Sequence, residues 1–129
     1  MSAENILVVD DDPIIGITFQ RELNEEGYNV ESVVNGEEAL KAVKLKKYSL
    51  VFIDKVMPGM DGIEVCRRIK EISPDSISIF MTGFLDKNNV IKEAEFVDAG
   101  GKVYYLYKPF SQGELLSVVQ NALKEPNNN

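Results

Sequence analysis

Four short polar motifs, each placed directly after an apolar run, constrain the fold of this chain more than any other feature. The apolar runs cover residues 6–9, 50–53, 77–81 and 103–107. The polar motifs that follow them are Asp10-Asp11-Asp12, Asp54, Thr82-Gly83 and Lys108-Pro109. Continuous apolar runs of this kind are typical of strands buried on both faces of a parallel sheet, whose ligands bind outside the carboxyl ends of the strands. The four motifs are therefore expected to share one edge of a sheet.

Segments with a helical period of apolar residues separate the runs, which is the pattern of repeated βα units. Five strands and five helices are expected, with the second strand near 29–33. Helix starts are indicated at 12–13, after 35–36, at 61 and at 111 by Pro, Asn-Gly or capping-box spacing. A further helix is expected between about 88 and 99, ended by Gly100-Gly101. The residues expected on the buried helix faces are Ile15, Phe19, Leu23, Ala39, Leu40, Val43, Val65, Ile69, Ile72, Val90, Ala94, Val97, Leu116, Val119 and Leu123.

Composition excludes several classes of function. At 129 residues the chain fits one domain, expected over 1–125, with a disordered tail or the start of a linker at 126–129. The net charge of −7 argues against a nucleic-acid partner, which would need clustered basic residues. The absence of histidine excludes His-dependent metal sites, Ser-His or Cys-His catalysis and a histidine phosphoacceptor in this chain. A single cysteine, Cys66, and the absence of a run of about 20 apolar residues predict a cytoplasmic protein without a membrane span.

The acidic motif has two interpretations. Asp12 can cap a helix while Asp10 and Asp11 are solvated loop residues. Alternatively, a hard dication such as Mg²⁺ relieves the repulsion among adjacent carboxylates. Asp54 favours the second interpretation, because it ends a strand expected beside the first and can point into the same crevice.

Thr82 and Lys108 each have a plain structural explanation, as a strand-end hydroxyl and a surface ammonium. Combined with the carboxylates, however, they supply a hydroxyl donor and a point charge for a tetrahedral anion. Neutralising the charge on a transferring phosphoryl group is the main requirement of phosphoryl transfer. The motifs together therefore suit a divalent metal and a phosphoryl group.

Four segments together resemble the receiver domain of two-component response regulators, the family typified by the chemotaxis receiver. The segments are ILVVDDDP, VFIDKVMPGMDG, FMTGF and YLYKPF, in the family's order and across essentially the whole chain. The resemblance implies a flavodoxin-like (βα)5 fold of the α/β class, with a doubly wound five-stranded parallel sheet of strand order 2-1-3-4-5.

The resemblance also implies roles for individual residues. Asp54 matches the phosphoacceptor, and Asp11, Asp54 and the backbone carbonyl of Val56 match the ligands of Mg²⁺, with Asp10 nearby through water. Thr82 would hydrogen-bond the phosphoryl oxygens, and Lys108 would pair with them.

The function implied is phosphorelay signalling. A histidine kinase or phosphotransfer protein would donate the phosphoryl group to a chain that is not an enzyme but promotes its own phosphorylation and dephosphorylation. Tyr105 matches the family's aromatic switch, which would alter the face formed by the helix near 88–99, the strand 103–107 and the helix from 111. A downstream protein or an output domain would bind that face, and a homodimer formed on phosphorylation is left open.

Departures from the family pattern and three alternatives accompany this interpretation. Thr82 and Lys108 are about one helical turn further apart in the sequence than is usual in the family, and apolar Val56 and Phe84 predict a long-lived phosphoryl group.

The alternatives are a degenerate receiver that only binds proteins, a receiver excised from a longer regulator, and a haloacid-dehalogenase-like phosphatase. The phosphatase would need a further acidic pair, whereas the chain beyond Lys108 offers only Glu114 and Glu125.

Overall fold

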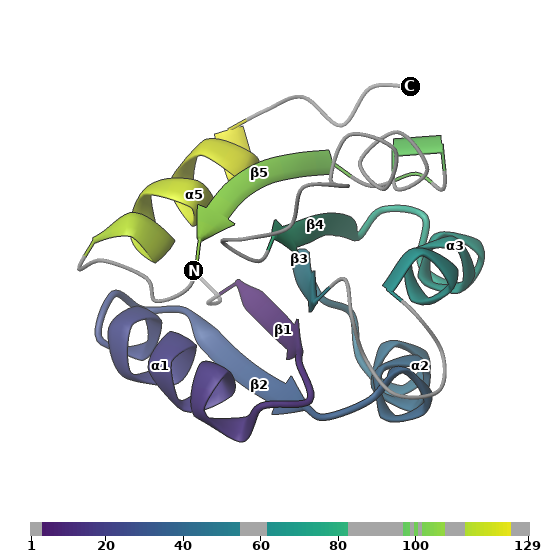
Figure 1. The fold of residues 1–129 in the computed structure, drawn as a ribbon, viewed down its shortest axis with the longest axis horizontal. Coiled ribbons are helices and arrows are strands. Elements are labelled where there is room, and N and C mark those ends of the chain that lie inside the picture. Colours follow the sequence, from purple (N-terminus) through teal and green to yellow (C-terminus); the bar gives the residue numbers. More distant parts are fainter. Residues whose placement is uncertain are drawn as a thin grey trace.

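The computed structural model describes residues 4–54, 62–82, 97–98, 100, 102–107 and 113–124 (Figure 1). The elements alternate along the chain as β1 (Asn5–Val9), α1 (Pro13–Asn24), β2 (Asn29–Val33), α2 (Gly36–Leu45), β3 (Leu50–Asp54), α3 (Gly62–Ile72), β4 (Ile77–Thr82), β5 (Lys102–Tyr107) and α5 (Glu114–Lys124). The helix expected near 88–99 lies mostly outside the described residues, as does the tail at 126–129.

The strands form one parallel five-stranded sheet in the order β2-β1-β3-β4-β5 (Figure 1). The predicted flavodoxin-like fold class and strand order are therefore confirmed. Two strands run one residue further than expected, so that Asp54 and Thr82 are the last residues of β3 and β4. Register places Val9 beside Ile53, and Asp54 beside Met81.

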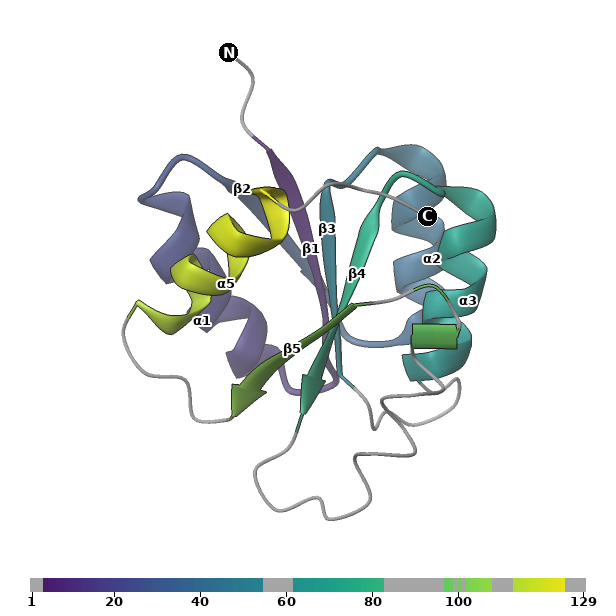
Figure 2. The ribbon, with the colours of Figure 1, turned by 90° about the horizontal axis from the view of Figure 1, so that it is seen from above.

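Helices cover both faces of the sheet, with α1 and α5 on one face and α2 and α3 on the other (Figure 2). Because successive side chains of a strand point to opposite faces, β1 contributes to two separate cores. Ile6 and Val8 pack with Phe19 of α1 and Leu115 of α5, among others. Leu7 and Val9 pack in the second core, which also contains Ala39, Val43, Val65, Cys66 and Ile69. Burial on both faces explains why the strands read as continuous apolar runs.

Two helix starts follow directly from the local sequence. The carboxylate of Asp12 accepts a 3.0 Å hydrogen bond from the Ile14 amide, ahead of Pro13 at the first position of α1. Asn35 caps α2 by accepting a 2.8 Å hydrogen bond from the Glu38 amide. Such caps satisfy amide groups that have no partner inside the helix, so they mark where a helix can begin.

Two residues expected on buried helix faces are exposed. Ile72, at the end of α3, is 37 % exposed, and Val97 is 53 % exposed. Ile72 is the last residue of α3, and the buried residues of that helix end at Ile69, so the apolar period continues beyond the part of the helix that the core covers. The expectation for Val90 and Ala94 concerns residues outside the described part of the chain.

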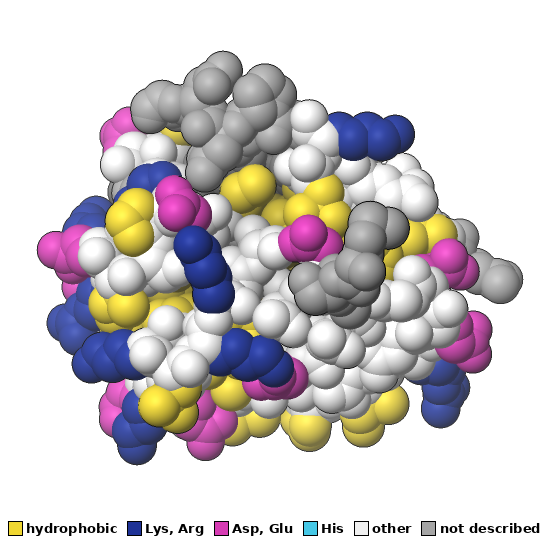
Figure 3. Space-filling view, turned by 180° about the vertical axis from the view of Figure 1, so that it is seen from behind, with side chains coloured by type: hydrophobic (Ala, Val, Ile, Leu, Met, Phe, Trp, Pro, Cys, Tyr) yellow, Lys and Arg dark blue, Asp and Glu magenta, His cyan; other side chains and the backbone are white. Residues whose placement is uncertain are grey.

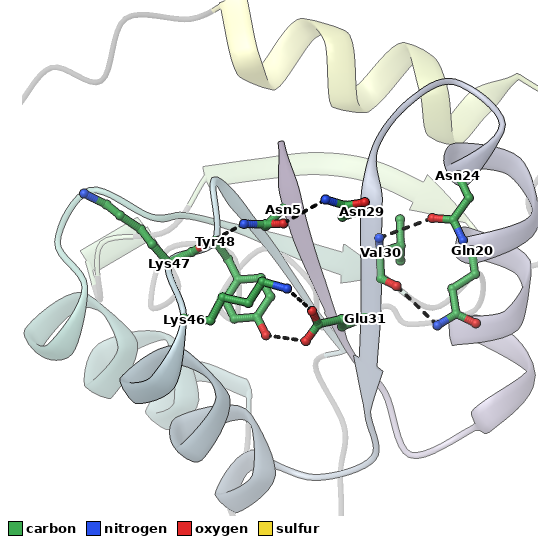
Figure 4. Close-up of polar contacts among 9 residues, drawn as sticks. All are labelled: Asn5, Gln20, Asn24, Asn29, Val30, Glu31, Lys46, Lys47 and Tyr48. Atoms are coloured by element: carbon green, nitrogen blue, oxygen red, sulfur yellow. Dashed lines mark hydrogen bonds and ion pairs between the residues drawn. The ribbon is translucent and has the colours of Figure 1, made fainter. Parts of the chain in front are cut away.

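The edge strand β2 is fixed by polar side chains on both sides (Figure 4). On one side, Gln20 donates to the Val30 carbonyl and the Val30 amide donates to Asn24, each at 3.3 Å, so side chains of α1 occupy groups that an edge strand would otherwise expose. On the other side, the Tyr48 hydroxyl donates a 2.6 Å hydrogen bond to Glu31, which also forms an ion pair with Lys46. The bonds from Lys46 and Tyr48 lower the pKa of Glu31.

Candidate functional site

Three carboxylates meet at the edge where β1 and β3 end. One oxygen each from Asp10, Asp11 and Asp54 lies within 4.8 Å of the other two. Register explains this meeting, because Asp10 and Asp54 directly follow Val9 and Ile53, which are partners on neighbouring strands. The structure therefore brings together the three aspartates that the sequence predicted to share a metal site.

The three carboxylates differ in their exposure to solvent. Asp10 is 2 % exposed and Asp54 is 9 % exposed, whereas Asp11 is exposed. Asp10 is held from two directions, since its amide donates to the Val33 carbonyl at 3.2 Å and its carboxylate accepts from the Asp12 amide at 2.9 Å. The site thus has a fixed, buried floor and one carboxylate open to solvent.

Asp12 is not one of these three carboxylates, because its side chain caps a helix. Its carboxylate caps α1, and the metal-site geometry is satisfied by the other three aspartates. The capping role of Asp12 is therefore confirmed. Asp10 and Asp11 lie close to Asp54, as the metal-site interpretation requires, and the binding of an ion by these three carboxylates stays a prediction.

The arrangement suits a hard divalent cation. Two unit charges 4.8 Å apart repel by between about 1 kcal/mol in bulk water and about 3.5 kcal/mol at an effective dielectric constant of about 20. A dication with oxygen ligands removes that repulsion, and Mg²⁺ commonly uses one or two carboxylates while keeping several waters. The exposed Asp11 leaves a solvent-accessible side through which an ion and a phosphoryl group can enter.

The remaining predicted site residues are described only in part. Thr82 ends β4 and is paired with Tyr107, the residue before Lys108, so these strands end at the sheet edge that holds Asp54. The backbone of Tyr105 lies in β5. The side chains of Thr82 and Tyr105, and the whole of Val56, Lys108 and Phe84, lie outside the described residues, so their assignments stay predictions.

Sequence reasoning missed the contacts that steady the elements around the site. Gly16 in α1 lies directly against Ser32 in β2, the strand whose last residue, Val33, holds the Asp10 amide. An isolated glycine inside a helical pattern was the available signal, since it often marks a close approach. The bond between Tyr48 and Glu31 had no such signal, because its partners are far apart in the sequence.

No helix in the described part of the chain has the length and apolar character needed to cross a bilayer.

Comparison with known proteins gives a consistent result. A family model for the response regulator receiver domain matches residues 6–120. The chain is 34 % identical over 125 residues to the uncharacterized transcriptional regulatory protein YkoG of Bacillus subtilis (strain 168), covering 97 % of this chain and 53 % of that protein. It is 34 % identical over 123 residues to sporulation initiation phosphotransferase F of the same organism, covering 95 % of this chain and 96 % of that protein. The chain thus spans about half of the first relative and nearly all of the second.

A solved structure extends the comparison to three dimensions. The CheY-like response regulator receiver domain protein from Methanospirillum hungatei JF-1 matches with a TM-score of 0.83 at 29 % identity, over 95 % of this chain and 94 % of that one. These matches favour the receiver over the haloacid-dehalogenase-like phosphatase. The chain therefore belongs to the response regulator receiver domain family.

Proposed function

We propose that this chain accepts a phosphoryl group on Asp54 from a phosphohistidine of a histidine kinase or phosphotransfer protein, in a Mg²⁺-dependent reaction. The observation that carries the proposal is the meeting of Asp10, Asp11 and Asp54 within 4.8 Å at the carboxyl edge of a receiver-family sheet. Asp54 is 9 % exposed, so its carboxylate can reach a donor yet remain in a site with little water.

The transfer exchanges one bond to phosphorus for another. A carboxylate oxygen of Asp54 attacks the phosphorus in line, the bond from phosphorus to the donor's imidazole nitrogen breaks, and neutral imidazole leaves after taking a proton. Bound Mg²⁺ would supply charge neutralisation for the phosphoryl oxygens. Asp10 and Asp11 would hold the ion, together with the backbone carbonyl of Val56, and the fixed position of Asp10 would orient it. Because the chain has no histidine, the donor belongs to another protein or segment.

Three residues, Thr82, Lys108 and Tyr105, would respond to a phosphoryl group on Asp54. Thr82 ends β4 beside β5, the strand that carries Tyr105, so a shift of Thr82 toward the phosphoryl group is placed to affect that strand. Lys108 would pair with the phosphoryl oxygens. A phosphoryl group that binds the active arrangement better shifts the population toward it, and a downstream protein or output domain would bind the altered β5–α5 face.

The relatives support both a free-standing and a longer protein. Sporulation initiation phosphotransferase F is matched over nearly all of its length, whereas YkoG is matched over about half. The proposed role as a phosphorelay receiver, without turnover of a separate substrate, is the same in either case.

Intact-mass analysis after incubation with acetyl phosphate and Mg²⁺ tests the proposal. We expect one hydroxylamine-labile phosphate in the native chain, and none in Asp54→Asn or when EDTA replaces Mg²⁺. Asp12→Asn is the matched control, because asparagine is also a good helix cap and this residue lies outside the carboxylate set.

Failure of the folded native chain to gain phosphate from either acetyl phosphate or a phosphorylated phosphotransfer protein would contradict the proposal and favour a binding-only receiver. The decay of the phosphate in the same samples tests the expectation drawn from Val56 and Phe84. A half-life of seconds would be inconsistent with a long-lived phosphoryl state.

A further inference from the structure

A groove lies between the carboxyl-terminal ends of α2 and α3, away from the aspartate site. It has a volume of about 350 Å³ and is formed by residues 43–47 and 72–75. These segments precede β3 and β4, so the groove is at the sheet edge where the strands begin. Asp10, Asp11 and Asp54 lie at the opposite edge, where the strands end.

The groove presents apolar side chains that the fold does not cover. Leu45 is 88 % exposed and Ile72 is 37 % exposed, although both belong to amphipathic helices. Val43 is 6 % exposed in the same groove, and Pro74 adds to it. Two large aliphatic side chains from different helices therefore share one concave surface, unlike an isolated exposed leucine.

Positive charge surrounds these apolar side chains. Lys44, Lys46 and Lys47 line the groove, and the ammonium of Lys70 donates to the Pro74 carbonyl at 3.1 Å. Lys46 is paired with Glu31, and Lys47 lies 3.4 Å from Asp75, but the described residues provide no ion pair for Lys44 or Lys70.

This charge contrasts with the rest of the molecule. Half of the chain's 14 Lys and Arg residues belong to α2, α3 and the segment 46–47, although the net charge is −7. Figure 3 shows many of the basic side chains on the left of the view, on the side of α2 and α3, with hydrophobic and acidic side chains among them. The same segments hold only four of the chain's 21 Asp and Glu residues, so basic residues are in excess there. An excess of positive charge on one side of an acidic protein favours a negatively charged partner.

We propose that this groove docks an acidic protein segment that inserts an aliphatic side chain between Leu45 and Ile72. The lysines provide the charge complementarity, and the two aliphatic residues provide the apolar contact that anchors a segment. A symmetric second copy fits less well, because a two-fold contact would place each lysine-lined groove against its equivalent. A nucleic acid would leave the aliphatic residues without a matching apolar group. The proposal does not depend on phosphorylation of Asp54.

Titration of the ¹⁵N-labelled full chain with synthetic peptides tests the docking site. The probe is a blocked peptide of six Asp and Glu residues around a central leucine, with the amide shifts of 43–47 and 72–75 followed by NMR. We expect saturable shifts concentrated in those segments. Binding should weaken about fivefold when serine replaces the peptide's leucine, which removes its apolar contact. It should disappear when lysines replace the acidic residues.

Variants of the chain separate the groove from general charge attraction. Leu45→Ser and Lys44→Glu alter exposed groove residues and should each weaken binding about fivefold. Ile17→Ser and Lys124→Glu are the matched controls, since they alter an exposed aliphatic residue and an exposed lysine on the other face of the sheet. The controls should bind the peptide as the native chain does.

Four outcomes would overturn the proposal. The first is that shifts spread over basic residues throughout the chain. The second is that Leu45→Ser binds the peptide as tightly as the native chain does. The third is that a duplex oligonucleotide of equal charge binds the groove more tightly than the peptide. The fourth is self-association in sedimentation experiments that Leu45→Ser abolishes, which would make the groove an interface between copies of this chain. Each result is independent of the acetyl phosphate assay, so the groove and the aspartate site can fail separately.

Discussion

Gly16 of α1 and Ser32 of β2 approach so closely that a Cβ added to the glycine would lie 2.5 Å from both the Cβ and the Oγ of the serine. Alanine normally stabilises a helix relative to glycine by about 1 kcal/mol. Here the steric conflict should dominate, and we expect Gly16→Ala to lower the free energy of unfolding by about 1–3 kcal/mol, measured by urea denaturation.

A double-mutant cycle with Ser32→Gly provides the control for this contact. Removing the serine Cβ should restore part of the free energy of unfolding that Gly16→Ala loses. The effect would appear as a coupling energy of about 1 kcal/mol between the two positions. Additive effects of the two substitutions would show that Gly16→Ala acts through something other than Ser32.

Asp11→Asn should have opposite effects on stability with and without metal. The substitution removes one of three carboxylates that lie within 4.8 Å of one another, so in EDTA we expect the variant to be more stable by about 1 kcal/mol. With Mg²⁺ the native chain should gain stability that the variant largely lacks, because an ion that binds only the folded state stabilises it. Thermal unfolding with and without Mg²⁺ measures both effects.

Asp12→Asn is the control for the metal effect, because this residue caps α1 rather than joining the carboxylate set. Its gain in melting temperature on adding Mg²⁺ should equal that of the native chain. An equal gain in Asp11→Asn would exclude Asp11 from the ion site.

Glu22→Gln should stabilise the protein at neutral pH. Its Oε2 is buried without a hydrogen-bond partner among the described residues, beside a small cavity also lined by Glu25 and Glu26. Burial, and then the nearby charge of Glu114, raise the pKa of Glu22 above its usual 4.5. The favourable contribution of the protonated acid is complete below pH 4.5 and is lost as the pH rises through the folded-state pKa.

Glutamine does not titrate at this position, so the variant does not lose stability in this way as the pH rises. We expect the stability difference to be small near pH 4 and to grow as the pH rises to 7, in urea titrations across that range. Glu26→Gln, at an exposed position of the same cavity, is the comparison. A difference between Glu22→Gln and the native chain that did not grow with pH would contradict the titration of Glu22.

Cys66 should be inert in the folded protein. The thiol is buried in α3, and burial raises its pKa to about 11, so little of the reactive thiolate forms at pH 8. Iodoacetamide should leave the native chain unmodified by mass analysis and alkylate it fully in denaturing urea. A Ser117→Cys variant in a Cys66→Ala background places a thiol at an exposed site of α5 and should react rapidly without denaturant. Rapid alkylation of native Cys66 would contradict its burial.

Much of the fold could be predicted because its signals are local. The strand at 29–33 and the start of α1 at Asp12-Pro13 agree with the structure, since an apolar period and a capping residue act over a few neighbouring positions. The continuation of α3 to Ile72 shows the limit of such reasoning, because helical periodicity does not reveal where the surface that covers a helix ends.

The sequence by itself determined the βα alternation, the parallel sheet and the placing of acidic groups at the ends of two neighbouring strands. Only the tertiary structure decided that Asp10 and Asp11 meet Asp54 while Asp12 caps a helix, and that Leu45 and Ile72 share an exposed groove. The physical reason is range: strand and helix preferences arise from nearby residues, whereas these contacts depend on the register and packing of segments that are distant in the chain.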